Sequence, residues 1–415
     1  MMGDALPEID RGRLWSRLME LANIGATGVP GEVNRQALSD EDAQVAAKVI
    51  AWGREAGLLP SLDQAGNLFL TLEGTDPGLP TILGGSHLDS QPTGGRFDGT
   101  IGVLAALEAV ALLADGVRPA HPVAVVAWCN EEGSRFAPGM SGSAAFAGVL
   151  GVEDVRGFRD ASGTTLGEAL DRFATSLGLE KQPAGFPVAG YVELHIEQGP
   201  VLEAAGLIIG AVTGIKGKKT WEVVLRGRKA HAGTQPMAQR QDALASFVRV
   251  GGVLHFGVTS AAPEAMFTIG RLEVSPNAPS VIPDEARFRI DLRHADGKIL
   301  EKLGALVETE ILANAAPCVA EITQLVDAPP NAFAPDLRRS ILSSATQRGL
   351  PAAELLSAAG HDARHMAPLA PSAMVFVPCR NGLSHHPDEW AEPDHVAAGA
   401  QVVADVLYHL AHGRN

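Results

Sequence analysis

Three apolar runs in this chain are each followed by histidine or acidic residues, and this arrangement narrows the folds open to it. The runs cover residues 81–83, 123–128 and 373–377. They lead to Gly85-Ser86-His87-Leu88-Asp89, Cys129-Asn130-Glu131-Glu132 and Gly382-Leu383-Ser384-His385-His386. Short continuous apolar runs are typical of buried strands in a parallel sheet. Because ligands collect beyond the carboxyl ends of such strands, we predict that the three segments meet at one edge and form a metal site.

The chain is long enough for two domains, and its pattern changes near residue 210. Before that point, helices at 12–22 and from Ser39, a strand at 68–72 and a helix at 102–114 follow the order of an α/β protein. After it come strand, helix, strand, strand, helix and strand, at 219–225, 242–254, 266–274, 286–293, 298–315 and 319–326. That order is the ferredoxin-like unit. We therefore predict a catalytic α/β domain with a mostly parallel sheet, residues 1–212 and 328–415, and an inserted ferredoxin-like (βαββαβ) lid domain, residues 213–327.

Charge, hydropathy and cysteine content indicate which partners and which location to expect. A formal charge of −15 and a pI near 5.3 argue against nucleic acid or an anionic membrane as the main partner. The start of the chain lacks the apolar core of a secretory signal, and no apolar run approaches the ~20 residues of a membrane helix. The three cysteines are odd in number and lack C-x-x-C spacing, which favours reduced thiols and a cytoplasmic location.

Five side chains are the candidate metal ligands: His87, Asp98, Glu132, His195 and His385. Zinc binds imidazole nitrogen and carboxylate oxygen in this way, and paired ions about 3.5–4 Å apart usually share a bridging carboxylate. Asp98 lies in the glycine-rich segment 94–99, which lets the backbone approach the ions. Asp89, two residues after His87, is placed to orient the His87 imidazole through its carboxylate. Other histidines, namely His121, His255, His361 and His365, are interpreted as ordinary surface or core residues.

Glu131 and Glu132 are adjacent, so their side chains diverge. One can therefore bind metal while the other faces water at the site. A general base beside water whose pKa is lowered to ~7 is the usual arrangement for metal-assisted hydrolysis.

In these motifs the chain resembles the zinc-dependent amidases of the hydantoinase/carbamoylase family, within the M20-type metallopeptidases. The resemblance covers nearly the whole chain. It is carried by Gly85 to Ser90, Gly94 to Gly99, Asn130 to Phe136, Glu193 to Pro200, His231 to Asp242, Gly360 to Ala363, Phe376 to Pro378 and Ser384-His385. The Asn-Glu-Glu-Gly-Ser-Arg-Phe and His-Ile-Glu-Gln-Gly-Pro strings distinguish this family from the plain M20 peptidases.

The resemblance implies two divalent ions, with zinc expected and manganese, nickel or cobalt as alternatives. His87, Asp98 and His195 would hold one ion, and Asp98, Glu132 and His385 the other. Glu131 would act as catalytic base and acid.

It also implies roles for residues of the lid. His231 would hydrogen-bond the developing oxyanion, while Gln198 and Arg293 would bind substrate. Arg293 has an alternative as a strand-end residue paired with Asp291 or Asp284. Because the lid usually forms the dimer contact in this family, a homodimer is expected, with lid residues serving either their own or the neighbouring subunit's site.

One departure from the family concerns the substrate. The family's lid carries Asn-Val-Ile-Pro-Gly, whereas this chain has Ser280-Val281-Ile282-Pro283-Asp284. Serine offers one hydroxyl donor in place of the two N–H groups of an amide. The expected reaction is hydrolysis of an N-carbamoyl amino acid to amino acid, CO2 and ammonia. Allantoate hydrolysis, an aminoacylase or exopeptidase activity, and a non-catalytic ligand-binding role are the alternatives.

Overall fold

The structure is a computed structural model that describes residues 8–413, and it divides into two units with separate hydrophobic cores. One unit is made by the chain up to Thr213 and from Ala332 onward, and the other by Gly214–Asn331. The boundaries expected from the sequence, at 212/213 and 327/328, lie close to these points.

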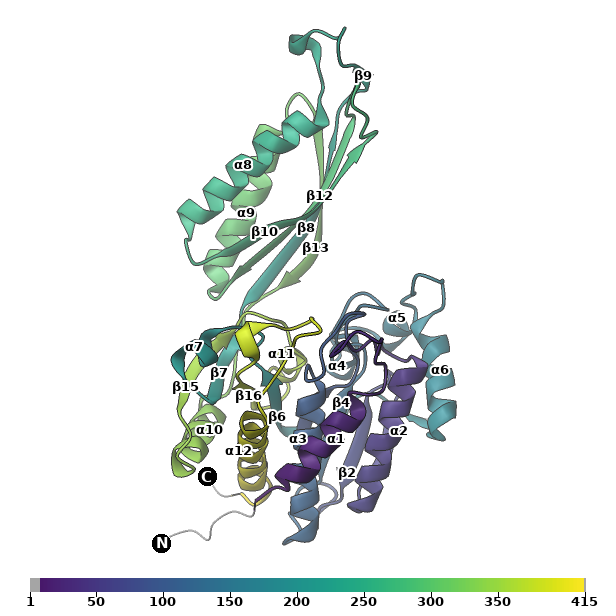
Figure 1. The fold of residues 1–415 in the computed structure, drawn as a ribbon, viewed down its shortest axis with the longest axis vertical. Helices are drawn as coiled ribbons and strands as arrows, with labels where there is room; N and C mark the ends of the chain where they lie inside the picture. The colour runs from purple at the N-terminus through teal and green to yellow at the C-terminus, as the bar shows by residue number, and fades with distance from the viewer. Residues whose placement is uncertain (1–7, 414–415) are drawn as a thin grey trace. The chain divides into compact units, whose positions relative to one another are not determined.

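The first unit is built on a mixed ten-stranded sheet (Figure 1). At its centre, β16, β6, β3 and β4 are neighbours and run parallel. On the flanks, β2 pairs antiparallel with β4 and with β1, and β7 pairs antiparallel with β16, whereas β1 and β5 are parallel. The strands are β1 (Leu59–Asp63), β2 (Leu68–Leu72), β3 (Thr81–His87), β4 (Val123–Trp128), β5 (Lys181–Gln182), β6 (Val188–Ile196), β7 (Ile209–Ile215), β14 (Asn331–Ala332), β15 (Ala352–Ser357) and β16 (Ser372–Val377). The predicted α/β class with a mostly parallel central sheet is confirmed.

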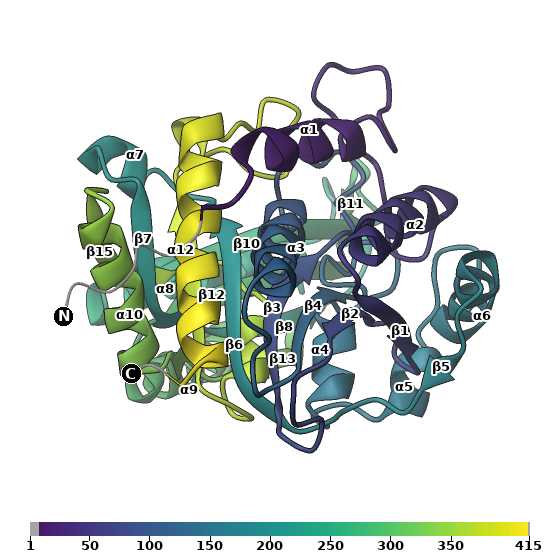
Figure 2. The same ribbon diagram turned by 90° about the horizontal axis from the view of Figure 1, so that it is seen from below.

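The central strands are apolar because both faces of the sheet are covered. Every residue of β4 and β16 is buried, which matches their unbroken apolar sequence. Helices α3 and α12 run side by side across the sheet (Figure 2). The helices of this unit are α1 (Arg11–Leu21), α2 (Asp40–Glu55), α3 (Thr100–Asp115), α4 (Ser141–Phe146), α5 (Val152–Arg156), α6 (Leu166–Leu177), α7 (Val201–Ala205), α10 (Pro335–Gln347), α11 (Ala363–Met366) and α12 (Pro393–Ala411), with a 3-10 turn η2 (Arg380–Gly382).

The sequence predicted the positions of the first helices correctly. Ser39 caps α2 by accepting a hydrogen bond from the main-chain N–H of Asp42, as its sequence predicted. Helix α3 is buried on nearly every side, and its Glu108 carboxylate pairs with Arg13 and Arg17 of α1 at 2.6 and 3.0 Å. These two ion pairs fix α1 against α3.

The second unit has the predicted β-α-β-β-α-β order, with a four-stranded antiparallel sheet in the order β10-β12-β8-β13 (Figure 1). Helices α8 and α9 pack together on one face, so that β12 alternates between buried and more exposed residues. The elements are β8 (Gly217–Arg226), β9 (Ala230–His231), η1 (Met237–Gln239), α8 (Ala243–Ala261), β10 (Met266–Ser275), β11 (Val281–Ile282), β12 (Glu285–His294), α9 (Gly297–Asn314) and β13 (Val319–Ala328).

Helix α8 is longer than its predicted range of 242–254. It continues to Ala261 because Val258 extends the buried row formed by Val250 and Leu254. Among residues 8–413, α8 is the one helix long and apolar enough, by length and composition, to cross a membrane, with a mean hydropathy of 1.2. The expectation that no apolar run approaches that length was therefore wrong. Only 28% of the segment is buried within the unit, so much of its apolar surface faces outward.

Candidate metal centre and active site

Parallel strands bring the predicted ligands to one edge of the sheet. His87 is the last residue of β3, and His195 is the penultimate residue of β6. Glu131 and Glu132 follow β4, and His385 follows η2 after β16. Because these four strands are parallel neighbours, their carboxyl ends meet, as the sequence predicted.

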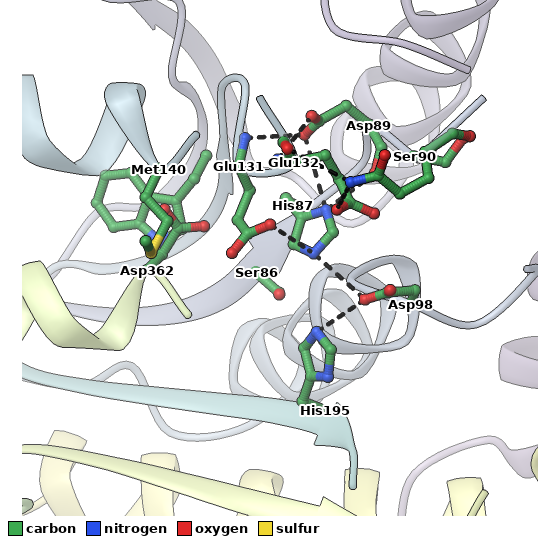
Figure 3. A network of polar contacts seen from close by, with 12 residues as sticks. Ser86, His87, Asp89, Ser90, Asp98, Glu131, Glu132, Met140, His195 and Asp362 are labelled. Carbon is green, nitrogen blue, oxygen red and sulfur yellow. Dashed lines mark hydrogen bonds and ion pairs between the residues drawn. The ribbon is translucent and has the colours of Figure 1, made fainter. Parts of the chain in front are cut away.

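Asp98 contacts three of the other candidate ligands, and Figure 3 shows its carboxylate joined to His87 and His195. Its Oδ1 atom is 3.5 Å from Nε2 of His87 and 3.1 Å from Nε2 of His195. Its Oδ2 atom is 3.0 Å from Nε2 of His385. One carboxylate thus faces three imidazoles through both of its oxygens, which is the arrangement required of a bridging ligand.

Two groups of three side chains have the geometry to hold an ion. The ligand atoms of His87, Asp98 and His195 lie within 4.8 Å of one another, and so do those of Asp98, Glu132 and His385. In the second group, Oε2 of Glu132 is 3.4 Å from Nε2 of His385. The structure therefore brings together the two ligand sets that the family resemblance implied.

Unsatisfied polar atoms support the fit of cations to these groups. Oε1 of Glu132 is buried and makes no hydrogen bond within residues 8–413. Nε2 of His195 is also buried, and its 3.1 Å contact with Asp98 lacks hydrogen-bond geometry. Buried polar atoms are nearly always paired, so such orphans indicate a missing partner. Imidazole nitrogen and carboxylate oxygen are both ligands that zinc and similar divalent ions accept.

The cluster also carries more negative charge than its environment accommodates. Burial, reinforced by the charge of Asp98, raises the pKa of Glu132 to about 7. The contact with Asp98 raises the pKa of His385 to about 9. Although burial opposes it, contact with His195, His385 and His87 lowers the pKa of Asp98 well below its ordinary value. These shifts indicate that the carboxylates attract nearby positive charge, which divalent ions would supply.

A third group, formed by Glu193, His195 and His361, also has ligand spacing. Both Glu193 oxygens already accept hydrogen bonds, from the hydroxyls of Ser86 at 2.7 Å and Tyr191 at 2.9 Å. Nε2 of His361 lies 3.1 Å from the Ser357 hydroxyl. We therefore interpret this group as a buried hydrogen-bond network behind the centre. His361, interpreted from sequence as ordinary, packs with its ring centroid 4.5 Å from that of His195.

Glu131 lies on the other side of His87 from Asp98 (Figure 3), with its Oε2 3.8 Å from Nε2 of His87. Burial, with further contributions from Asp362 and Glu132, raises the pKa of Glu131 well above its ordinary value. Glu131 and Glu132 contact different histidines, His87 and His385, so their side chains diverge as expected for adjacent residues. A carboxylate in this position beside the centre is placed to accept and return a proton.

Asp89 acts on the centre in two ways. Nδ1 of His87 lies 2.9 Å from the main-chain oxygen of Asp89, and the Asp89 carboxylate is farther away, at 3.7 Å. The hydrogen bond that orients the His87 ring is therefore to the main chain, where the sequence had suggested the carboxylate. The carboxylate instead accepts the main-chain N–H groups of Glu131 and Glu132, both at 3.2 Å.

The predicted substrate residues are distributed over both units. Gln198, in the first unit, donates through Nε2 to Asp98 Oδ2 and to the Ser384 hydroxyl, both at 3.0 Å. In the second unit, Val281 pairs with His231 in the β9–β11 ribbon, and the main-chain oxygen of Ser280 accepts the N–H of Ala232 at 3.0 Å. His231 and Ser280 are thus close neighbours.

Arg293 lies elsewhere in the second unit. It pairs with Asp291 at 2.8 Å, one of the two alternatives left open from sequence. In the register of β12 and β8, Arg293 lies opposite Lys218, whereas the β9–β11 ribbon follows the other end, where Glu285 lies opposite Arg226. At ~3.3 Å per residue, the eight residues from Glu285 to Arg293 span about 26 Å.

Three residues that position the centre were missed from sequence. Gln91 donates to Oε2 of Glu132 at 2.7 Å. Arg35 is buried and donates to the main-chain oxygens of Leu88, Leu21 and Ile24 and to the Thr100 hydroxyl. Glu389 is buried beside Asp98, and its pKa is raised to about 7 by burial and by the Asp98 charge. Of these three, only Glu389 could have been suspected from the sequence, because it is an acidic residue four positions after His385.

A buried carboxylate beside clustered histidine and acidic side chains, at the carboxyl edge of a parallel sheet, defines the metal-dependent hydrolase class. The chain belongs to peptidase family M20/M25/M40, whose model matches residues 83–409. It is therefore an enzyme, a hydrolase of this family.

The chain is similar in sequence to several amidohydrolases over almost their whole length. The chain is 40% identical to the N-carbamoyl-L-amino-acid amidohydrolase of Rhizobium meliloti, covering 97% of this chain and 95% of the relative. It is 34% identical to the allantoate amidohydrolase of Bacillus subtilis, covering 94% and 96%. Among solved structures, a hydantoinase/carbamoylase family amidase from Burkholderia multivorans matches with a TM-score of 0.87 and 40% identity, covering 97% and 98%. The resemblance stated from the motifs is confirmed.

Proposed function

We propose that the chain hydrolyses an N-carbamoyl amino acid to the free amino acid, CO2 and ammonia at a centre of two divalent ions. The observation that carries this proposal is the position of Asp98 among three imidazoles, with Glu131 beside His87. The similarity to an N-carbamoyl-L-amino-acid amidohydrolase at 40% identity favours this substrate class.

The two ions would be held by His87, Asp98 and His195 and by Asp98, Glu132 and His385. We expect zinc, with manganese, nickel or cobalt as alternatives, because this ligand set accepts several of these metals. When bound, such ions lower the pKa of water to ~7 and polarise the carbonyl of the substrate.

Four side chains of the protein would transfer protons, stabilise the intermediate or bind the substrate. Glu131 takes a proton from the attacking water and returns it to the leaving nitrogen, a role for which it is placed beside His87. His231 donates a hydrogen bond to the oxyanion of the tetrahedral intermediate. Both amide N–H groups of Gln198 face Asp98 and Ser384, so its oxygen is the atom that would accept from the substrate. Arg293 would bind the substrate carboxylate through a charge-assisted pair, in exchange for Asp291.

We propose that the active form is a homodimer. His231 lies beyond one end of the four-stranded sheet, whereas Arg293 lies within β12 near the other end, about 26 Å of strand from Glu285. A ureido acid is much smaller than that, so one copy cannot bring both residues to the same substrate. A second copy would supply one of them.

The outer face of α8 is the surface we propose for the dimer contact. Val248 and Phe256 are 65% and 74% exposed, and Gly252 lies between them at the same helical spacing. The neighbouring edge strand β10 exposes Met266 and Leu272. An exposed apolar stripe next to an unpaired strand edge is typical of an association surface. This surface accounts for the high hydropathy of α8 without a membrane.

We also propose a cytoplasmic location and no role for nucleic acid. The cysteines Cys129, Cys318 and Cys379 are buried and free, which fits a reducing compartment. The formal charge of −15 disfavours polyanions.

A substrate panel tests the reaction. Ammonia release would be measured with N-carbamoyl-α-amino acids, N-carbamoyl-β-alanine and allantoate, each with Zn²⁺ or Mn²⁺ added to the metal-free protein. We expect turnover of at least one N-carbamoyl-α-amino acid. Turnover of allantoate alone would favour the second candidate, which the similarity to the Bacillus subtilis enzyme supports. Release of amino acids from peptides, without ammonia from any ureido substrate, would overturn the proposal.

A further inference from the structure

We propose that Glu389 is a positioning residue that joins the segments carrying Asp98 and His385, and so sets the affinity for the ion held by Asp98, Glu132 and His385. Glu389 is 2% exposed and is none of the expected ligands. The inference rests on the proposed two-ion centre and extends it to a difference between the two ions.

One oxygen of Glu389 fixes the backbone of Asp98. Oε1 accepts the main-chain N–H groups of Phe97 at 2.9 Å and of Asp98 at 3.1 Å. Two hydrogen bonds from consecutive N–H groups to one carboxyl oxygen restrain the rotation of the peptide between Phe97 and Asp98. They therefore restrain the direction in which the Asp98 side chain leaves the backbone.

The other oxygen of Glu389 reaches the segment that carries His385. Oε2 accepts from the Ser384 hydroxyl at 3.0 Å. That hydroxyl also lies 3.2 Å from Asp98 Oδ2, and because it has a single proton, Glu389 and Asp98 compete for it. His385 follows directly and has a φ of +55°, an unusual backbone conformation for a histidine, so its neighbours must hold it there.

The shape of the glycine-rich turn supports the same role independently. A Cβ atom on Gly95 would lie 2.2 Å from both Cδ and Oε1 of Glu389. The turn therefore leaves room for the Glu389 carboxylate only because residue 95 has no side chain. A backbone that closes around one carboxylate in this way indicates that the carboxylate is part of the site.

The two ions should not depend equally on Glu389. The rings of His87 and His195 are oriented by other groups, since Nδ1 of each lies 2.9 Å from a main-chain oxygen, that of Asp89 or Ile196. Asp98 is shared between both sets, but only the second set contains His385. Loss of Glu389 should therefore weaken the second ion more than the first.

The test is the Glu389→Gln variant, which keeps the size of the side chain but replaces one acceptor oxygen by a donor. The metal-free full-length protein would be titrated with Zn²⁺ in competition with a coloured chelator, which reports both affinities. We expect the first ion to bind as in the unchanged protein and the second to bind at least ~10-fold more weakly. Gly95→Ala, which pushes the carboxylate aside, should show the same asymmetry.

Glu392→Gln is the matched control. Glu392 lies in the same segment, is 50% exposed and pairs with Arg380, away from the ligands. Both affinities should be unchanged in this variant, and the melting temperature of each metal-free variant would report its folding. If Glu389→Gln and Gly95→Ala bind both ions like the unchanged protein, or lose both equally, the role assigned to Glu389 is overturned. If the unchanged protein itself binds fewer than two ions, the two-ion centre is at fault.

Discussion

Glu131 and His87 face each other across 3.8 Å, from Oε2 to Nε2, although His87 ends β3 and Glu131 follows β4. The same imidazole nitrogen lies 3.5 Å from Asp98 on its other side. Glu131 is thus beside the ligands without belonging to either ligand set, which separates its proposed chemical role from metal binding.

That separation leads to the first prediction. Glu131→Gln removes the base but keeps the size of the side chain, so kcat should fall by about 100-fold or more. The metal content, measured by mass spectrometry, should remain near that of the unchanged protein. Glu132→Gln, one residue away, is the contrasting variant and should lose metal. Full turnover by Glu131→Gln would exclude the assigned base.

The second prediction concerns the two ends of the second unit. His231→Ala and Arg293→Ala should each be inactive as purified homodimers. A mixed dimer with one copy of each variant should recover about half of the activity, because one of its two sites would combine an intact His231 with an intact Arg293 from different copies. Mixed dimers would be isolated with two affinity tags after co-expression. Absence of any recovery would mean that one copy supplies both residues.

The third prediction concerns Gly99, the residue before α3. Its φ is +63°, and an added Cβ would lie 2.4 Å from Cε1 of His87. Gly99→Ala should therefore displace the imidazole and lower zinc affinity by at least ~10-fold, as measured by chelator competition. Gly178 has the same φ with open space around it, so Gly178→Ala controls for the cost of positive φ and should bind zinc normally.

The fourth prediction is a pH dependence of stability. Burial, reinforced by the charge of Asp89, raises the pKa of Asp42 from 3.8 to about 7. The folded state therefore keeps a proton that the unfolded state loses, and stability falls as the pH rises from about 4 to about 7. The effect is about 1.4 kcal/mol for each pH unit at most.

Asp42→Asn should remove this slope. It retains an oxygen that can accept the Leu38 N–H, now 2.8 Å from the Asp42 carboxylate. Urea midpoints of the two metal-free proteins would be compared from pH 5 to pH 8. The stability of the unchanged protein relative to the variant should decline up to about pH 7 and then level off. A constant difference would show that Asp42 titrates normally.

Local patterns in the sequence determined the elements that carry the site. Unbroken apolar runs identified β4 and β16, and Ser39 marked the start of α2. The end of α8 was misplaced, because the stripe that continues to Val258 is set by packing against the second unit's sheet. Spacing and residue type follow from short-range geometry, so they can be read without knowing the fold.

The candidate ligands could be named from sequence because imidazole and carboxylate groups after parallel strands have few other uses in such numbers. Only the tertiary structure decided which other side chains contact these candidate ligands and the segments that carry them. Glu389 meets Asp98, Gln91 meets Glu132 and Arg35 supports Leu88 through contacts between distant segments. The separation of His231 from Arg293 likewise follows from strand register. Such contacts depend on how elements pack together, and the order of residues along the chain carries no direct record of that packing.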